Sequence, residues 1–214
     1  PVPGFLELRQ AISEKLNRDN NLDYKPTQIC VSNGAKQSII NVLSAIINDG
    51  DEVILPAPYW VSYDEMVKLV GGTSVFIQTS IDTEFKITAE QLEKAITPKT
   101  KALLYSSPCN PSGSYYTGEE LEAIANVIAK YPDITIISDE IYEFINYEGK
   151  HVSIASFPQV YEQTAVINGM SKAFAMTGWR IGYSACPEWL AKACDKVQGQ
   201  MTSGANTVAQ RASI

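Results

Sequence analysis

The sequence predicts a three-layer α/β fold, in which helices cover both faces of a seven-stranded, mostly parallel sheet. Two observations favour this class. Strand-like and helix-like patterns alternate along the chain, which is the order of elements in a sheet packed between helices. The strand-like segments are continuous runs of Val, Ile and Leu, so both of their faces are expected to be covered. The 214 residues contain no repeat, low-complexity tract or long linker, and one domain is therefore expected.

Seven segments have the composition of buried strands. The most apolar is residues 134–139, which carries isoleucine at positions 134, 136 and 137. The last segment, residues 181–186, is expected to be the single antiparallel strand of the sheet. The full set of expected strands is 29–33, 52–56, 74–78, 101–107, 134–139, 164–168 and 181–186.

Between these strands, apolar residues recur at helical spacing. The clearest case follows a glycine turn at Gly34, where Ile39, Leu43 and Ile47 fall on one face. Helices are expected at residues 6–16, from Gly34 to about 47, at 89–96, at 119–131, and from 207 to the last residue. A further helix is expected after Trp60, ending at about residue 70.

The composition excludes several classes of protein. Apolar residues make up 45% and charged residues 19% of the chain, as in a globular protein with a sizeable core. A net charge of -7 argues against a nucleic-acid surface, although a small anion can still bind in a local positive pocket. No apolar run approaches the ~18 residues that cross a bilayer, and the first residues lack the order of a signal peptide.

The four cysteines, Cys30, Cys109, Cys186 and Cys194, have neither metal-site spacing nor a redox motif. We expect reduced core thiols, which favours a cytoplasmic setting, and we assign no metal site. His151 is the only histidine, and it follows Gly149 in a polar stretch where a catalytic role is not expected.

The strongest chemical signal is the segment Asn168-Gly-Met-Ser-Lys172-Ala-Phe-Ala-Met-Thr-Gly-Trp-Arg180-Ile-Gly-Tyr183. Lys172 comes directly after an expected strand, and Arg180 lies eight positions later at the start of another. An amine in an apolar pocket near a second cation loses proton affinity, because desolvation and like charge both disfavour the ammonium. Such a lysine forms Schiff bases, and the arginine suits a fixed phosphate.

Other polar residues also follow expected strands, at the edge where ligands gather in an open parallel sheet. The run from Asn33 to Gln37 opens a helix whose N-terminus favours an anion, although the same run suits an ordinary tight turn. Trp60 can stack on a flat heteroaromatic ring or fill the core. Asn110, between two prolines, can hold a rigid turn or donate to a phenolate oxygen.

Asp139 ends the most apolar strand, and a buried carboxylate there needs a partner. A protonated ring nitrogen would serve as that partner, whereas the alternative role for this aspartate is to cap the following segment.

Taken together, these residues resemble class I pyridoxal-phosphate aminotransferases, over essentially the whole chain. Within this family, the prokaryotic aspartate aminotransferase branch is the most similar. Three sequence segments carry this resemblance: Lys36-Gln37, Pro58-Tyr-Trp-Val-Ser-Tyr63 and Ala173-Phe-Ala-Met-Thr-Gly-Trp-Arg180. The resemblance implies that residues 1–214 form the large, cofactor-binding domain. It also implies that the small C-terminal domain, with its substrate-binding arginine, and the N-terminal arm lie outside the chain.

The resemblance further implies roles for individual residues. Lys172 would form the Schiff base and move the proton at the substrate α-carbon, and Asp139 would face the pyridine nitrogen. Tyr142 and Asn110 would donate to the cofactor 3′-oxygen. The expected phosphate ligands are Arg180, Ser171 and the backbone of Gly34, Ala35 and Lys36, and the expected substrate contacts are Trp60, Asn110 and Lys36.

The activity implied is a ping-pong transamination, with L-aspartate as the expected donor and 2-oxoglutarate as the expected acceptor. Lys36 matches a lysine that this branch associates with the distal carboxylate of the substrate, and an exposed lysine at a helix start remains the alternative interpretation of it. A cytoplasmic homodimer is also expected. Two other hypotheses stay open: a related carbon–sulfur β-lyase or other elimination enzyme, and a non-catalytic aminotransferase-like sensor domain.

Overall fold

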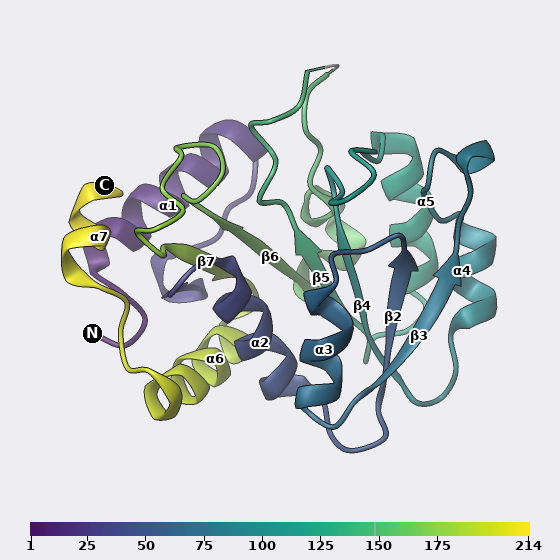
Figure 1. Cartoon of the computed structure of the whole chain (residues 1–214), viewed down its shortest axis with the longest axis horizontal. Helices are drawn as coiled ribbons and strands as arrows, with labels where there is room; N and C mark the ends of the chain where they lie inside the picture. Colours follow the sequence, from purple (N-terminus) through teal and green to yellow (C-terminus); the bar gives the residue numbers. More distant parts are fainter. Residues whose placement is uncertain (148) are drawn as a thin grey trace.

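The computed structural model describes residues 1–147 and 149–214, and it confirms the predicted three-layer architecture (Figure 1). The seven-stranded sheet has the order β1-β7-β6-β5-β4-β2-β3. β7 is antiparallel to both of its neighbours, and the remaining pairs are parallel. The strands are β1 (Ile29–Ser32), β2 (Glu52–Ala57), β3 (Thr73–Gln78), β4 (Thr100–Ser106), β5 (Thr135–Asp139), β6 (Thr164–Gly169) and β7 (Gly182–Ala185).

Helices cover both faces of this sheet, as the continuous apolar runs predicted (Figure 1). In β4, Leu104 packs against one layer of helices and Leu103 packs against the other, and both are buried. One layer contains α2 (Ala35–Ile46), α3 (Ser62–Leu69) and α6 (Glu188–Met201). The other contains α4 (Ala89–Ala95) and α5 (Gly118–Ile128) at one end of the sheet, and α1 (Leu6–Asn20) and α7 (Thr207–Ala212) at the other.

Four short 3₁₀ helices complete the described chain: η1 (Pro26–Gln28), η2 (Ile81–Thr83), η3 (Ile154–Ser156) and η4 (Pro158–Gln163). The helix α6 was not predicted from the sequence, although its buried residues, which include Leu190, Ala191 and Cys194, recur at helical spacing. The expectation that the last helix runs to residue 214 is wrong at its end. That helix stops at Ala212, and Ser213 is its C-cap.

Close approach between α2 and β7 holds the N-terminus of α2 at the carboxyl ends of the parallel strands. A Cβ atom added to Gly182 would lie 2.2 Å from the backbone nitrogen of Ala35. Real side chains do not allow such a contact, so glycine at position 182 is what permits this packing.

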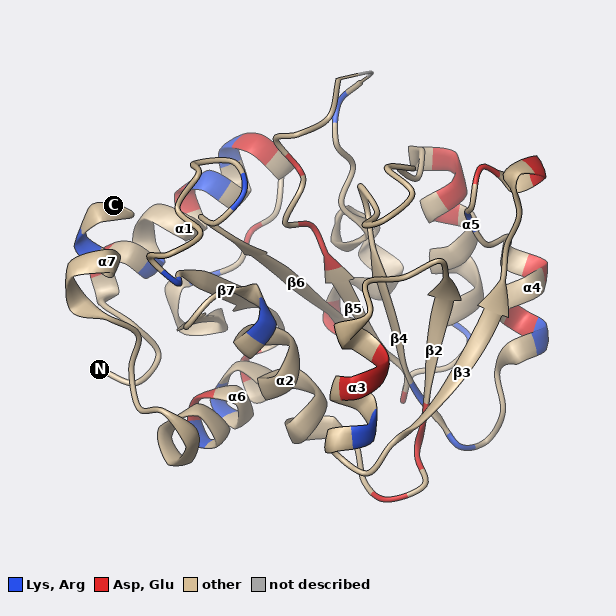
Figure 2. Cartoon of the chain, viewed as in Figure 1, with Lys and Arg blue, Asp and Glu red and all other residues tan. Residues whose placement is uncertain are grey.

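Lys and Arg lie interspersed with Asp and Glu on the visible elements (Figure 2). In the described part of the chain, no helix combines the length and the apolar character needed to cross a membrane. Nor do the described residues include a group of three or more His, Cys, Asp or Glu side chains placed to hold a metal ion.

Candidate active site

A cavity of about 200 Å³ lies at the carboxyl ends of β4 and β5 and at the N-terminus of α2. One water molecule occupies roughly 30 Å³ of liquid, so this space can hold a small organic molecule. Nine of the ten residues predicted for the site line it, and the tenth, Gly34, lies under the guanidinium of Arg180. The nine are Ala35, Lys36, Trp60, Asn110, Asp139, Tyr142, Ser171, Lys172 and Arg180.

Asp139 is the last residue of β5 and is buried at the cavity wall. Its Oδ2 accepts a hydrogen bond from the Tyr63 hydroxyl at 2.7 Å, and its Oδ1 accepts one from the Ile141 N–H at 3.2 Å. Burial raises the pKa of Asp139 to about 6, although these two hydrogen bonds favour the charged form. A cation entering the cavity would therefore find a carboxylate that lacks a directly bound positive partner among the described residues.

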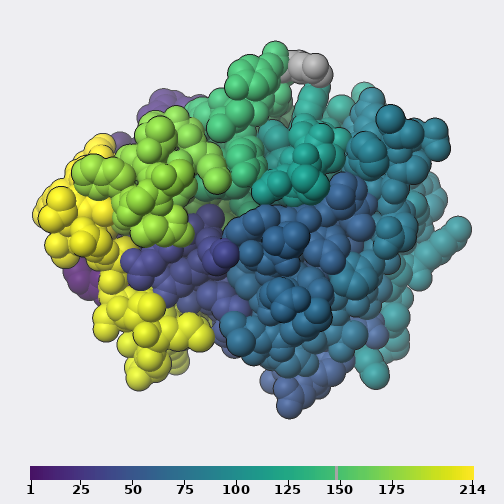
Figure 3. Space-filling view, viewed as in Figure 1, coloured from purple at the N-terminus to yellow at the C-terminus, as the bar shows by residue number. Residues whose placement is uncertain are grey.

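Lys172 and Tyr142 line the same cavity. The Lys172 Nζ is 5.7 Å from the centroid of the Tyr142 ring. The prediction of an apolar pocket around Lys172 is wrong for this chain, because its side chain is exposed. Residues 170–180 form turns and irregular chain at the cavity mouth, and the same segment forms part of the surface seen in Figure 3.

Arg180 is fixed by its own turn and by the start of α2. Its guanidinium donates to the Thr177 carbonyl at 2.9 Å and to the Asn33 carbonyl at 3.3 Å. A Cβ atom on Gly34 would lie 2.2 Å from the Arg180 Nη2, and Gly34 also has a positive φ of 84°. Glycine at position 34 thus lets the guanidinium lie directly over the helix N-terminus.

Three donors of this region point to an anionic ligand. The N-terminus of α2 lacks a side-chain cap within the described chain, so the N–H groups of its first two residues, Ala35 and Lys36, remain available. The buried Ser171 Oγ has no hydrogen-bond partner among the described residues. Arg180 adds a fixed positive charge. A phosphate group would satisfy all three features.

Lys36 and Trp60 form one rim of the cavity. The Lys36 Nζ lies 4.7 Å from the centroid of the Trp60 ring, within the range of a cation–π contact. Trp60 in turn packs edge-on against Tyr63, with centroids 5.6 Å apart. The rim therefore presents a positioned cation beside a flat aromatic surface.

Asn110 enters the cavity from a tight turn after β4, as predicted. The turn is closed by the Gly113 N–H, which donates to the Cys109 carbonyl at 2.8 Å, and by the Cys109 N–H, which donates to the Ser114 carbonyl at 2.8 Å. Asn110 is thus held in place by its backbone surroundings.

Four lining residues were not predicted: Tyr63, Ser106, Ile141 and Thr177. Tyr63 lies three positions after Trp60, and this spacing at the start of a helix was the available signal. Ser106 pairs in register with Asp139 on the neighbouring strand. That register is not visible in the sequence, so Ser106 had no such signal.

The aminotransferase class I and II family model matches residues 1–214, and the chain belongs to this family. Class I aminotransferases depend on pyridoxal phosphate. The chain is 50% identical over 215 residues to the bifunctional aspartate aminotransferase and glutamate/aspartate-prephenate aminotransferase of Petunia hybrida, covering 100% of the chain and 45% of that protein. It is 49% identical over 216 residues to the aspartate aminotransferase of Bacillus subtilis, covering 100% of the chain and 55% of that protein.

Solved structures agree with this assignment. The aspartate aminotransferase of Rhizobium meliloti superposes with a TM-score of 0.98 at 42% identity, over 99% of this chain and 54% of that one. The aspartate aminotransferase of Thermus thermophilus with maleate gives a TM-score of 0.96 at 45% identity, over 99% and 55%. The chain spans about half the length of the curated relatives that it matches.

The cavity fits pyridoxal phosphate by the chemistry of its donors. The unpartnered Ser171 Oγ, Arg180 and the uncapped α2 N-terminus suit the phosphate. The buried carboxylate of Asp139 suits a protonated ring nitrogen, and the amine of Lys172 suits the aldehyde.

Proposed function

We propose that this chain is the large, cofactor-binding domain of a pyridoxal-phosphate aminotransferase that moves the α-amino group of L-aspartate to 2-oxoglutarate. The observation that carries the proposal is one cavity lined by the amine of Lys172, the buried carboxylate of Asp139 and the guanidinium of Arg180. These three groups are what a Schiff-base cofactor with a ring nitrogen and a phosphate requires.

Each residue has a defined task in this proposal. When bound, pyridoxal phosphate supplies an electron sink for the substrate α-carbon. Asp139 holds the proton on the ring nitrogen, because a buried carboxylate favours a bound cation over an empty site. Lys172 would take the proton from the substrate α-carbon and deliver it to the C4′ carbon of the cofactor. Tyr142 and Asn110 donate to the 3′-oxygen and so favour its anionic form.

The choice of a dicarboxylic substrate is supported by the cavity rim. Lys36 is held against Trp60 at 4.7 Å and provides a cation for a distal carboxylate. The names of the relatives from Petunia hybrida and Bacillus subtilis both include aspartate aminotransferase.

The test is a keto-acid assay on the full-length protein with aspartate, with and without 2-oxoglutarate. A transaminase should give at most one keto acid per active site without the acceptor, and continuous turnover with it. Continuous release of thiol, keto acid and ammonia from a substrate with a sulfur leaving group on its β-carbon, such as L-cystathionine, without any acceptor would instead indicate a carbon–sulfur elimination enzyme. A protein without visible cofactor absorbance would contradict the proposal altogether.

We also propose that the full-length protein is a cytoplasmic homodimer. A homodimer is supported by large apolar side chains on the surface of residues 170–180, where Phe174 and Trp179 are about half exposed (57% and 47%). A cytoplasmic location is supported by the four free cysteines. Analytical ultracentrifugation of the full-length protein tests the first of these, and a monomer would contradict it.

A further inference from the structure

Two buried glutamates flank Tyr142 and do not line the cavity within the described chain. Glu140 and Glu143 are the first and fourth residues of a turn that is closed by the Glu143 N–H, which donates to the Glu140 carbonyl at 2.9 Å. Tyr142 is the third residue. The two glutamates are only 1% and 7% exposed. Buried carboxylates need strong partners, so their surroundings indicate their purpose.

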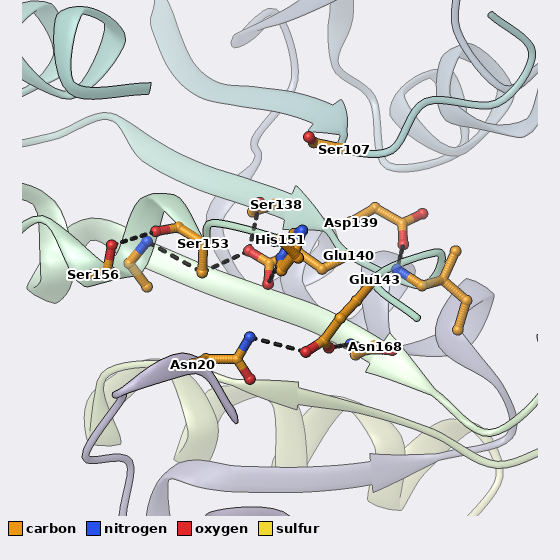
Figure 4. A network of polar contacts seen from close by, with 12 residues as sticks. Asn20, Ser107, Ser138, Asp139, Glu140, Glu143, His151, Ser153, Ser156 and Asn168 are labelled. Carbon is orange, nitrogen blue, oxygen red and sulfur yellow. Dashed lines mark hydrogen bonds and ion pairs between the residues drawn. The ribbon is translucent and has the colours of Figure 1, made fainter. Parts of the chain in front are cut away.

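Glu140 ties the far end of the following loop back to the sheet (Figure 4). Its Oε1 accepts hydrogen bonds from Ser138 Oγ at 3.0 Å and from Ser153 Oγ at 2.6 Å. Its Oε2 lies 2.9 Å from the Nε2 of His151, whose side chain is buried. Ser138 belongs to β5, whereas His151 and Ser153 lie just before η3. Both ends of the loop that carries Tyr142 are therefore joined through one carboxylate.

Glu143 ties the same turn to two other elements. Its Oε1 accepts from Lys15 Nζ at 2.6 Å and from Asn20 Nδ2 at 2.9 Å, both in α1. Its Oε2 accepts from Asn168 Nδ2 at 2.6 Å. Asn168 lies in β6, four residues before Lys172. Glu143 thus connects the turn of Tyr142 to the strand that leads to Lys172 (Figure 4).

We propose that Glu140 and Glu143 are positioning residues, which clamp the turn of residues 140–143 and hold Tyr142 in place against Lys172. Charge-assisted hydrogen bonds are stronger than neutral ones. This strength explains why carboxylates occupy two positions that do not line the cavity within the described chain. The inference rests on the proposed function, because it assigns these residues to the same reaction. A misplacement of about 1 Å at a reacting site can cost roughly 100-fold in rate.

Two variants release the clamp without changing a cavity residue. Asn168→Asp keeps the Oδ1 that accepts from the Gly169 N–H at 2.7 Å, but replaces the donor to Glu143 with an oxygen. His151→Leu removes the partner of Glu140, and His151→Gln restores a donor there. Ser156→Ala is the matched control, because Ser156 Oγ donates to the Ser153 carbonyl at 2.8 Å and does not reach either glutamate.

The readouts on the full-length holoenzyme are the pH midpoint of its visible absorbance, kcat, KM for aspartate, and Tm. Loss of the Tyr142 hydrogen bond to the 3′-oxygen should raise the midpoint by about one unit in both clamp variants, because that donor favours the deprotonated form. We expect kcat to fall about 10- to 100-fold. KM should change less than about threefold, since Lys36 and Trp60 lie on other elements and keep their contact. His151→Gln should recover most of the loss, and Ser156→Ala should match the wild type.

A lower Tm with unchanged midpoint and kcat would show a purely structural role and overturn the inference. If one clamp variant fails to fold, the other decides by the same criteria. A wild type that lacks the cofactor absorbance would overturn the proposed function, and the inference with it. A wild type with normal absorbance and turnover, alongside unaffected folded variants, would overturn the inference alone.

Discussion

Asp139 and Glu140 are adjacent in the chain and both are buried, but they meet different surroundings at the end of β5. Asp139 lines the cavity, and its donors are Tyr63 and the Ile141 backbone. Glu140 receives two serine hydroxyls and the His151 ring. Glu140 directly follows β5, and its N–H still donates to the Ile167 carbonyl at 2.8 Å, so the alternation of side chains along the strand separates the two environments.

This difference separates a carboxylate placed for a ligand from one placed to hold the turn that carries Tyr142. The surroundings of Asp139 leave its pKa raised to about 6, which is a cost to the folded protein that a bound cation can relieve. The surroundings of Glu140 include a direct cationic partner when His151 is protonated. The predictions below test this division, from the largest expected effect to the smallest.

The largest effect is expected at Lys172, whose amine lines the same cavity as Asp139. Lys172→Ala should lower kcat by about 10⁴-fold, because the proton at the substrate α-carbon loses its acceptor. Steady-state transamination by the full-length protein measures this. Lys130→Ala is the control, since Lys130 pairs with Glu93 on the surface at 2.7 Å. A Lys172→Ala enzyme with near-normal kcat would remove the amine from the mechanism.

Asp139→Asn should lower kcat by about 100- to 1000-fold, because the ring nitrogen loses its charged partner. In the cofactor-free protein the same change should stabilise. The folded pKa of about 6 lies above the ordinary value, so the stability of the wild type falls as the pH rises from about 4 to about 6. The raised pKa of Asp139 costs the wild type about 3 kcal/mol of folding stability at neutral pH, which the substitution removes. Asparagine offers one acceptor fewer to the Ile141 N–H, and this loss offsets about 1 kcal/mol of the gain.

Glu140→Gln should destabilise the folded protein, whereas Asp139→Asn should stabilise it. Glutamine keeps the size of the side chain but loses the charge that faces His151. We expect the free energy of unfolding to fall by about 1 to 3 kcal/mol at neutral pH. Denaturant titrations of both variants at pH 7 measure the contrast. Two destabilised variants, or two stabilised ones, would contradict the division of roles.

Tyr63→Phe tests how much the hydroxyl contributes to the ionised form of Asp139. Removing a donor at 2.7 Å should raise the pKa of Asp139 further and weaken pyridoxal phosphate binding by about 10-fold. Equilibrium titration with the cofactor measures the affinity. An unchanged affinity would show that Asp139 does not depend on Tyr63 for its charge.

The smallest effect is expected from the protonation of His151. Burial alone would lower the pKa of His151, but the charge and hydrogen bond of Glu140 outweigh it and raise the pKa above its usual value. The pair therefore contributes its full stability below about pH 6.5 and loses it as the pH rises through the raised pKa. The stability difference between wild type and His151→Gln should shrink along this range. NMR titration gives the pKa directly, with the resonance of His151 assigned by its loss in the His151→Gln variant. A pKa below 6.5 would contradict the pairing.

The sequence predicted the strands to within one residue at each end, because continuous apolar runs mark strands that are covered on both faces. The helix α6 was not predicted, although its buried residues recur at helical spacing. The sequence also did not predict the order of the strands in the sheet. β1 lies beside β7 through pairs such as Ile29 with Ala185, and such long-range pairing leaves no local signal.

The site was predicted where residue type and position at a strand end combined, as for Asp139 and Lys172. Ser106 was missed because its pairing with Asp139 depends on the register of two strands, which is not visible in the sequence. Tyr63 was missed although its spacing from Trp60 was available, and only its hydrogen bond to Asp139 shows its role. His151 was expected in a polar stretch without a catalytic role, and nothing local indicated its burial against Glu140. Its partner is eleven residues away, across the loop that carries Tyr142.

The most direct test of the whole account is borohydride reduction of the full-length holoenzyme, followed by peptide mapping. The account predicts a pyridoxyl group on Lys172 and on no other lysine, with loss of the visible absorbance. Attachment to Lys36, which lines the same cavity, or a failure to label any lysine would contradict it.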